Sequence, residues 1–248
     1  MPDDLHEWPA EMGVSDGALE GWRHLDPAAA LLDATGIPGR VINDATAACA
    51  AEMIAGGAMT TGNALYFYVG AFAGGGVVLN GRLMRGAQMN AGALGSMPMA
   101  ENDAQGRPAQ LIHLASALDL ERMLIAAGKG ASGVLADDPD PERNAVFEAW
   151  ADRAAPALAR AAVSGLSVFD FDSVVIDGVL GRVWRARLAA RVAAEMARFN
   201  HAGLRAAAVV PGSIGPSARV LGAALLPLTE RFAPDPDLIA TPAVAAGR

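Results

Sequence analysis

The stretch VINDATAACAAE (residues 41–52) leads from two β-branched residues through Asn43 and Asp44 into an alanine-rich run. The pattern predicts a helix over 45–55 that begins after Asp44 and ends at the glycine pair 56–57. The Asp44 carboxylate has two possible roles at such a junction. It can cap the helix by accepting hydrogen bonds from N–H groups two or three residues on, or it can act as a general base toward a substrate hydroxyl. The local sequence alone favours the cap.

Cysteine and histidine usage argues against a metal centre. The chain has 248 residues, enough for one large domain or two small ones with a sizeable core. Its single cysteine, Cys49, excludes an internal disulfide and a Cys-rich metal cluster. The four histidines lack the spacing of metal ligands, so we expect no zinc site. They are His6, His24, His113 and His201.

Hydropathy and charge indicate a cytoplasmic protein with no membrane partner. No stretch approaches the run of about 20 apolar residues that a membrane span needs. The acidic start is unlike a secretory signal. The net charge of −8 disfavours a surface that binds nucleic acid. The arginines of residues 182–191 would spread over more than one side of a helix, which favours a solvated helix face over a phosphate-binding patch.

Periodicity and end signals predict helices that alternate with strands. Asp26 before Pro27, with Gly36 as the stop, predicts a helix over 26–36. Asn80 and Gly81 form a pair typical of hairpin turns. The remaining predicted elements are strands over 40–42, 65–69, 171–178 and 206–213, helices over 144–169, 183–199 and 217–232, and a strand or helix start followed by a helix within 109–127. This order indicates an α/β protein with a mixed or parallel sheet.

Two glycine-containing segments have both a functional and a purely structural interpretation. Glycines in GAFAGGG (70–76) would let backbone N–H groups approach a phosphate, but a tight β-turn needs them for geometry alone. No lysine and no helix follow the segment in the manner of a P-loop, so the structural interpretation is favoured. The segment NAGALGSMPMA (90–100), taken alone, is an ordinary loop.

The order of motifs along the chain is more specific than any one of them. An ND-A-x-A-A helix start is followed by a G-x-x-x-G-G-G turn, an NGRL-x-x-G hairpin, AG-x-x-G-x-x-P and a late GAALL. This succession resembles the ROK family, which is named for its repressors, open reading frames and kinases. The similarity is strongest over residues 40–100 and continues more weakly to about residue 228.

The resemblance implies an α/β, actin-like sugar-kinase fold with two ribonuclease-H-like lobes and a sugar-binding cleft between them. Asn43 and Asp44 fall on the family's asparagine–aspartate pair. In ROK kinases this asparagine holds the sugar and the aspartate activates the attacking hydroxyl, which is the logic of phosphoryl transfer. One expectation is therefore an ATP-dependent hexose kinase with Asp44 as general base and with ATP and Mg as cofactors.

The phosphate-binding motifs of the family's kinases are incomplete here. The N-terminal D-x-G-x-T that cradles phosphates does not occur in residues 1–40. The second phosphate loop usually reads G-T-G-x-G-x-G, and here Ala71 and Phe72 replace its threonine and second glycine. These changes remove a hydroxyl donor and place a bulky ring where phosphate should approach.

The sugar, zinc and nucleoside motifs also depart from the kinase pattern. The usual G-E-x-G-H reads GALGS over 92–96, so the sugar-binding glutamate and the histidine are missing. The Cys-rich zinc loop is absent, and the late Gly-Gly has become Asp177-Gly178. Loss at all of these positions argues against kinase activity, because truncated polar side chains cost much of a site's affinity. The glycine framework persists, so we expect the backbone shape to be kept.

The ROK family has a second branch of regulators, in which a winged helix-turn-helix precedes the same sugar-kinase-like body. We therefore expect a truncated regulator without kinase activity, whose DNA contact depends on an N-terminal domain absent from this chain. Residues 1–44 would be a remnant of an incomplete first lobe, 45–56 an inter-lobe helix, and 62–248 the second lobe. A terminal helix at about 217–230 would pack back toward the first lobe.

The expected ligand of this body is a sugar-like or other small polar effector. Its candidate contacts are Asn43, Asp44, Asn90 and Ser96. We expect no catalytic residue, no cofactor and no metal, and we interpret four glycines as a phosphate-loop remnant: Gly70, Gly74, Gly75 and Gly76. A homodimer is expected, with 183–199 or 109–127 as its face. A non-functional remnant with exposed sheet edges is a third possibility.

Overall fold

The computed structural model describes residues 14–15, 17–103, 105–130 and 140–232. The chain divides into two compact units, Met1–Asp44 and Ala45–Arg248. The described part of the first unit contains a 3₁₀ helix η2 (Glu20–His24) and the helix α2 (Pro27–Thr35). The Asp26 carboxylate accepts hydrogen bonds from the backbone N–H groups of Ala28 and Ala29, so α2 begins where the sequence predicts.

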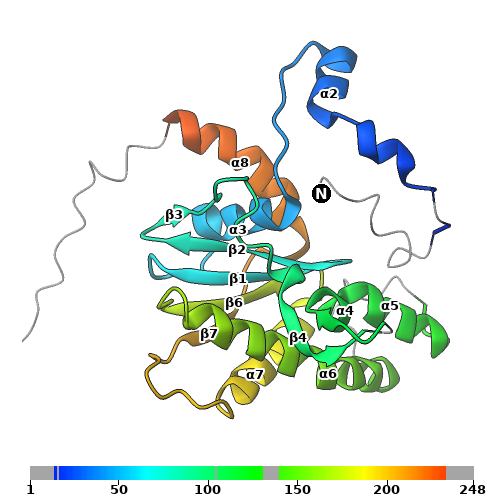
Figure 1. Cartoon of the computed structure of the whole chain (residues 1–248), viewed down its shortest axis with the longest axis vertical. Coiled ribbons are helices and arrows are strands. Elements are labelled where there is room, and N and C mark those ends of the chain that lie inside the picture. The colour runs from blue at the N-terminus through cyan, green and yellow to red at the C-terminus, as the bar shows by residue number, and fades with distance from the viewer. Residues whose placement is uncertain (1–13, 16, 104, 131–139, 233–248) are drawn as a thin grey trace, which may run out of the picture. The chain divides into compact units, whose positions relative to one another are not determined.

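The second unit is built on a mixed five-stranded sheet in the order β3-β2-β1-β6-β7 (Figure 1). Strand β1 pairs antiparallel with β2 and parallel with β6, and β7 continues the parallel part beside β6. Asn80 and Gly81, both with positive φ, form the tight turn between β2 and β3. The strand bounds are β1 (Ala64–Val69), β2 (Ala73–Leu79), β3 (Arg82–Leu83), β6 (Ser173–Gly178) and β7 (Ala208–Pro211).

The remaining elements follow in chain order. The helices are α3 (Asp44–Ala55), α4 (Ile112–Ala115), α5 (Ala117–Ala126), α6 (Pro141–Leu166), α7 (Arg182–Met196) and α8 (Ala218–Phe232). Short 3₁₀ helices are η3 (Leu94–Ser96) and η5 (Gly215–Ser217), and a separate two-stranded hairpin comprises β4 (Pro98–Asn102) and β5 (Pro108–Gln110).

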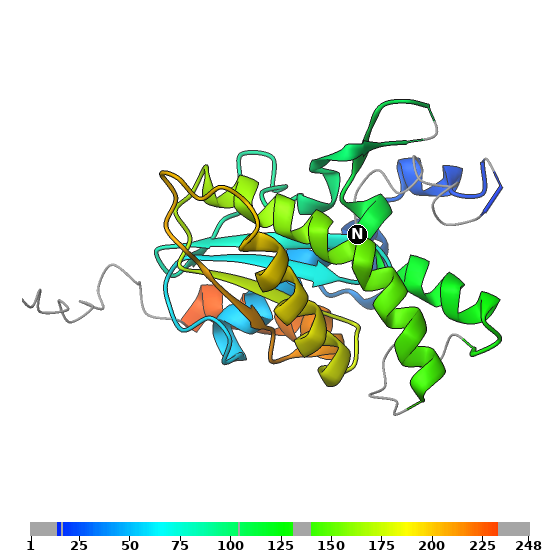
Figure 2. The ribbon, with the colours of Figure 1, turned by 90° about the horizontal axis from the view of Figure 1, so that it is seen from below.

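Both faces of the sheet are covered by helices. Side chains alternate along a strand, and in β1 Leu65, Phe67 and Val69 pack into one cluster while Tyr66 and Tyr68 pack into the other. The first cluster includes residues of α5, α6 and α7, and the second includes residues of α3 and α8. Figures 1 and 2 show α6 and α7 side by side across one face and α3 with α8 on the opposite face.

Helix α3 approaches its neighbours through small residues. A Cβ at Gly76 of β2 would lie 2.5 Å from the Cβ of Cys49 in α3. A Cβ at Gly222 of α8 would overlap the backbone carbonyl of Ala47 on α3. The alanine-rich helix therefore fits between β2 and α8 only because both neighbours present glycine at the crossing points.

Most predicted elements are confirmed, and three predictions are wrong. No strand forms over residues 40–42, and none of the strands among the described residues pairs with them. Gly74, Gly75 and Gly76 lie inside β2 rather than in the turn before it. The hairpin β4–β5 lies within and beyond the segment that the sequence left as a loop. The predicted acidic loop over 136–142 lies mostly outside the described residues.

Replacing Gly222 by alanine tests the crossing of α3 and α8. Alanine is favoured over glycine in a helix by about 1 kcal/mol, so local propensity alone predicts a more stable protein. We expect the opposite, a loss of about 1–3 kcal/mol in the free energy of unfolding measured in urea, because the new methyl group meets the Ala47 carbonyl. Gly57→Ala is the control, since a Cβ there has open space. A stabilised Gly222→Ala protein would contradict the crossing.

Candidate functional site

The carboxyl ends of the parallel strands define the region in which a ligand is expected. Val69 at the end of β1 lies opposite Gly178 of β6, and Ile176 of β6 lies opposite Pro211 of β7. In open α/β sheets, ligands bind outside this edge. The segments that follow these strands, and the helices that they start, are therefore the candidate site.

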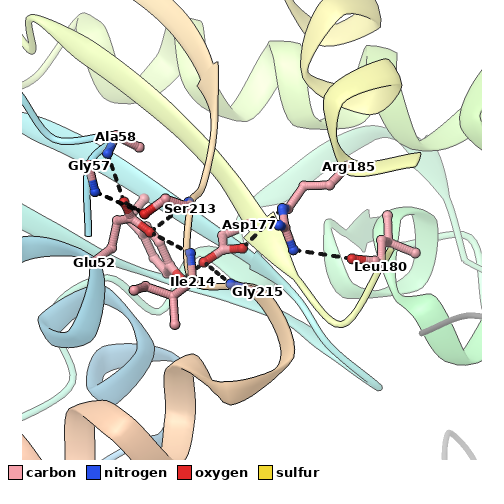
Figure 3. A network of polar contacts seen from close by, with 10 residues as sticks. Glu52, Gly57, Ala58, Asp177, Leu180, Arg185, Ser213, Ile214 and Gly215 are labelled. Carbon is pink, nitrogen blue, oxygen red and sulfur yellow. Dashed lines mark hydrogen bonds and ion pairs between the residues drawn. The ribbon is translucent and has the colours of Figure 1, made fainter. Parts of the chain in front are cut away.

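Glu52 binds the segment that follows β7 (Figure 3). One carboxylate oxygen accepts hydrogen bonds from the Ala58 N–H at 2.8 Å and the Ser213 hydroxyl at 2.7 Å. The other oxygen accepts from the N–H groups of Ser213 at 2.9 Å and Ile214 at 3.2 Å. The Ser213 Oγ also accepts from the Gly57 N–H at 2.9 Å. We call this arrangement the Glu52 clasp.

The Glu52 clasp is formed by a carboxylate with no exposure to solvent. A buried charge is costly unless hydrogen bonds replace its water, and here four donors do so. Three of the donors are backbone N–H groups, which a change of side chain elsewhere would not remove. The clasp therefore joins the end of α3 to the start of the segment that leads into α8.

A second buried carboxylate, Asp177, lies at the carboxyl end of β6 (Figure 3). Its Oδ2 accepts a hydrogen bond from the Tyr66 hydroxyl at 2.8 Å and one from the Gly215 N–H at 3.3 Å. Its Oδ1 lies 3.4 Å from Nε of Arg185, and the Arg185 guanidinium also donates to the Leu180 carbonyl. Asp177 thus links β1, α7 and the start of η5.

Burial dominates the electrostatics of this cluster. It raises the pKa of Asp177 above its usual value, although the hydrogen bonds from Tyr66 and Gly215 and the Arg185 charge oppose the shift. Burial and the neighbouring Asp177 also raise the pKa of the Tyr66 hydroxyl well above its usual value. Tyr66 therefore stays protonated and donates its hydrogen to the carboxylate.

The turn between β1 and β2 uses its polar groups within the protein. The Ala73 N–H donates to the Ser116 hydroxyl at 2.9 Å, and the Gly70 and Ala71 carbonyls accept from the first N–H groups of α5. The Ser116 carbonyl in turn accepts from the Trp150 indole N–H at 3.2 Å. The N–H group of Ala73, the residue of β2 that follows the turn, is thus bonded within the protein, and the carbonyls of the turn accept from the start of α5.

The predicted effector contacts lie at two places in the chain. Asn43 precedes α3, and Asp44 is its first residue. Asn90 and Ser96 are exposed on the segment between β3 and β4, and Ser96 is the last residue of η3. That these four side chains contact one ligand stays a prediction, as does the capping role of Asp44.

Of the predicted phosphate-loop remnant, only Gly70 lies in the turn. The other three glycines belong to β2, where they make room for neighbours on both faces of the strand. On one face a Cβ at Gly74 would lie 2.9 Å from the Ala45 Cβ, and on the other a Cβ at Gly75 would overlap Leu94. Packing therefore accounts for these glycines without a phosphate.

The arginines of residues 182–191 mostly bond within the chain. Arg185 is buried beside Asp177. Arg191 donates to Glu148 at 2.5 Å and also pairs with Asp152, both on α6. These partners favour a structural role over a phosphate-binding patch.

Glu52 and Ser213 are the site residues that the sequence analysis missed. Glu52 carries one detectable signal, because it is an acidic side chain near the end of an otherwise apolar helix, ATAACAAEMIA. Ser213 carries none. Ser213 lies 161 residues after Glu52 in the sequence, so the contact between them cannot be inferred before the fold is known.

Within the described ranges, no three His, Cys, Asp or Glu side chains are grouped so as to hold a metal ion. No helix among the described residues has the length and apolar character to cross a membrane.

Comparison with known proteins assigns the family. The model of the ROK family matches residues 13–230. The chain belongs to the ROK family. Its mixed α/β fold is accordingly that of the ROK sugar-kinase structures, an actin-like ATPase fold.

Curated proteins similar to this chain include an enzyme and an uncharacterized protein. The bifunctional enzyme NanE/NanK of Brucella melitensis is 37% identical over 155 residues, which cover 60% of this chain and 28% of that protein. The uncharacterized protein y4fQ of Sinorhizobium fredii is 31% identical over 206 residues, 82% of this chain and 50% of that protein. The matched part thus spans between about a quarter and a half of these relatives.

Solved structures of both branches of the ROK family match. The ROK hexokinase of Thermus thermophilus has 28% identity and a TM-score of 0.59, covering 82% of this chain and 70% of that one. A Streptomyces griseus glucokinase, solved with glucose and AMPPNP, has 21% identity and a TM-score of 0.62 over 83% and 73%. A ROK regulator, a homolog of the E. coli MLC protein, has 23% identity and a TM-score of 0.57 over 80% and 54%.

Asp177→Asn tests the buried carboxylate. Because its pKa is raised in the folded protein, folded Asp177 holds a proton at pH values where an unfolded aspartate has lost it. The stability of the wild type should therefore fall as pH rises from the usual aspartate pKa, about 3.9, through the raised value. Since Asp177→Asn lacks this loss, its free energy of unfolding relative to wild type should increase over that range and then level off.

Urea unfolding at several values between about pH 4 and pH 7 measures this difference. The exposed carboxylate Asp152, changed to asparagine, is the control for general charge effects. A difference between Asp177→Asn and wild type that stays constant with pH would show that Asp177 ionises normally.

Proposed function

We propose that this chain is the effector-sensing and dimerisation body of a ROK-type regulator, and that it binds a sugar or similar small polar molecule without transferring phosphate. The observation that carries the proposal is the turn between β1 and β2. Directly after it the Ala73 N–H of β2 is bonded to Ser116, and within it Phe72 stands where the resemblance implies a glycine of the phosphate loop. A phosphate that bound the Ala73 N–H would have to displace this internal hydrogen bond.

Two further features support a body without phosphoryl transfer. The 92–96 segment offers Ala93 and Ser96 where the family's kinases have a glutamate and a histidine. At the carboxyl end of β6, the buried carboxylate of Asp177 replaces a glycine and is enclosed by Tyr66, Arg185 and Gly215. A carboxyl group that is bonded within the protein takes the place of the small residue that this edge has in the family's kinases.

Asn43 and Asp44 remain the groups best suited to bind an effector. An amide and a carboxylate can both hydrogen-bond to sugar hydroxyls, and binding of a sugar in this way does not require ATP. In a regulator, binding of the effector would change the conformation of this body, and DNA contact would come from a domain outside this chain. The match to a ROK regulator structure is consistent with this body but rests on fold alone.

An ATP-dependent sugar kinase is the second candidate, and the names of the relatives favour it more than the first. NanE/NanK is an enzyme, and the Thermus thermophilus and Streptomyces griseus structures are a hexokinase and a glucokinase. In this candidate Asp44 is the general base, and the N-terminal phosphate motif lies outside this chain.

Sugar binding is tested by thermal unfolding with hexoses, N-acetylhexosamines and disaccharides. A ligand at about 100 times its Kd stabilises the folded protein by about 2.7 kcal/mol, which raises Tm by several degrees. We expect at least one sugar to do so, and Asn43→Ala to abolish the shift. Asn200→Ala, in the exposed loop after α7, is the control and should keep it. No shift with any sugar would exclude a sugar effector.

Phosphoryl transfer is tested by ADP formation with MgATP and each stabilising sugar. We expect no sugar-dependent ADP above the rate without sugar, because the phosphate turn is internally bonded. Asp44→Asn should leave this background unchanged. Sugar-dependent ADP that Asp44→Asn removes would establish the kinase candidate instead.

A further inference from the structure

The interfaces of α3 restrain its distance from its neighbours better than its position along its own axis. Cys49 faces Gly76, Ala45 faces Gly74, and the Ala47 carbonyl faces Gly222. These contacts are close, but alanine and glycine form shallow ridges and grooves. The large interlocking side chains that would resist a small slide along the axis are missing from these three contacts. These three contacts therefore leave the axial position of the helix to its other interactions.

The Glu52 clasp has the geometry for this task. It lies near the carboxyl end of α3 and bonds to donors from two separate segments, Ala58 on one side and Ser213 with Ile214 on the other. Hydrogen bonds weaken steeply with distance and angle, so a slide of about 1 Å would break several of them together. The carboxylate is also fully buried, so water could not replace the lost donors without opening the packing.

We propose that Glu52 is a positioning residue that locks α3 along its axis and thereby fixes Asp44 at the opposite end of the helix. A helix of 12 residues is about 18 Å long and moves as a rigid rod over that length. Asp44 is the first residue of α3, so its position follows any slide of the helix. The consequence for ligand binding rests on the proposed function, whereas the lock itself does not.

The lone cysteine offers a reporter on this helix. Cys49 lies in the middle of α3, has no exposure, and is the only cysteine of the chain. Burial, and to a lesser degree Glu52, raise the pKa of its thiol, so it is inert to thiol reagents while α3 is in place. Its rate of labelling by a disulfide reagent therefore measures how often α3 loosens.

The decisive comparison is Glu52→Gln with Met196→Ala. Glutamine keeps the size and one acceptor of Glu52 but turns an NH₂ group toward the clasp donors. Met196 is a buried residue of α7 in the cluster on the other face of the sheet, so its truncation destabilises the protein without touching α3. The free energy of unfolding of each variant, measured in urea, and the labelling rate of the same variant when unfolded together give the labelling rate that global unfolding alone would produce.

We expect Cys49 in Glu52→Gln to label at least tenfold faster than global unfolding predicts, and Met196→Ala to label at the predicted rate. If the Cys49 labelling rates of both variants equal the rates that global unfolding predicts, the proposed lock is wrong. Should Glu52→Gln fail to fold, Ser213→Ala decides the matter, because it removes the hydroxyl and leaves all three backbone donors to Glu52. In Ser213→Ala, Cys49 should label several-fold faster than global unfolding predicts. A labelling rate equal to the predicted one would overturn the proposal.

The same variants separate the lock from the proposed function. If a sugar stabilises the wild type, Glu52→Gln should raise its Kd at least several-fold while Met196→Ala leaves it unchanged. Unchanged sugar affinity in Glu52→Gln would show that the lock does not position Asp44. If no sugar binds the wild type, the proposed function fails, and the labelling of Cys49 still decides whether Glu52 holds α3.

Discussion

The close contact between α3 and the glycines of β2 is the constraint on which the second unit depends. Because Gly76 has no side chain, Cys49 packs directly against the backbone of β2. Gly222 in the same way lets α8 pack closely against the Ala47 carbonyl of α3. This places the end of α3 within hydrogen-bonding reach of the segment after β7, where Ser213 meets Glu52. The polar contacts are thus a consequence of the apolar packing, and a larger residue at Gly76 or Gly222 would disturb both.

Features of the fold with local causes could be predicted from the sequence. The helix after Asp26 follows from a cap, a proline and a terminal glycine, and the turn at Asn80-Gly81 follows from two residues that tolerate positive φ. The β4–β5 hairpin lacks such a pair. Its turn is held by the Asp103 carboxylate, which accepts from the N–H groups of Gln105 and Arg107. A single aspartate in a polar segment is too common a signal to predict a hairpin.

The candidate site was less predictable because its contacts are distant in sequence. Glycines in a turn and glycines beneath a helix look alike in a sequence, so the pattern predicts a phosphate turn at Gly74 and Gly76, whereas the structure places both in β2 against α3. Asn43 and Asp44 were selected by family resemblance, which local patterns could not have supplied. Glu52 became recognisable only when the fold brought Ser213 to it across 161 residues.

The outer strands of the sheet bear on how the chain behaves while it is being made. On one side β3 has two residues and an exposed Arg82, and on the other β7 has four and ends in Pro211. Short strands, a charge and a proline give an incoming chain little to pair with. The two edge strands therefore offer other copies of the chain little backbone to pair with, which disfavours aggregation through the sheet edges during synthesis.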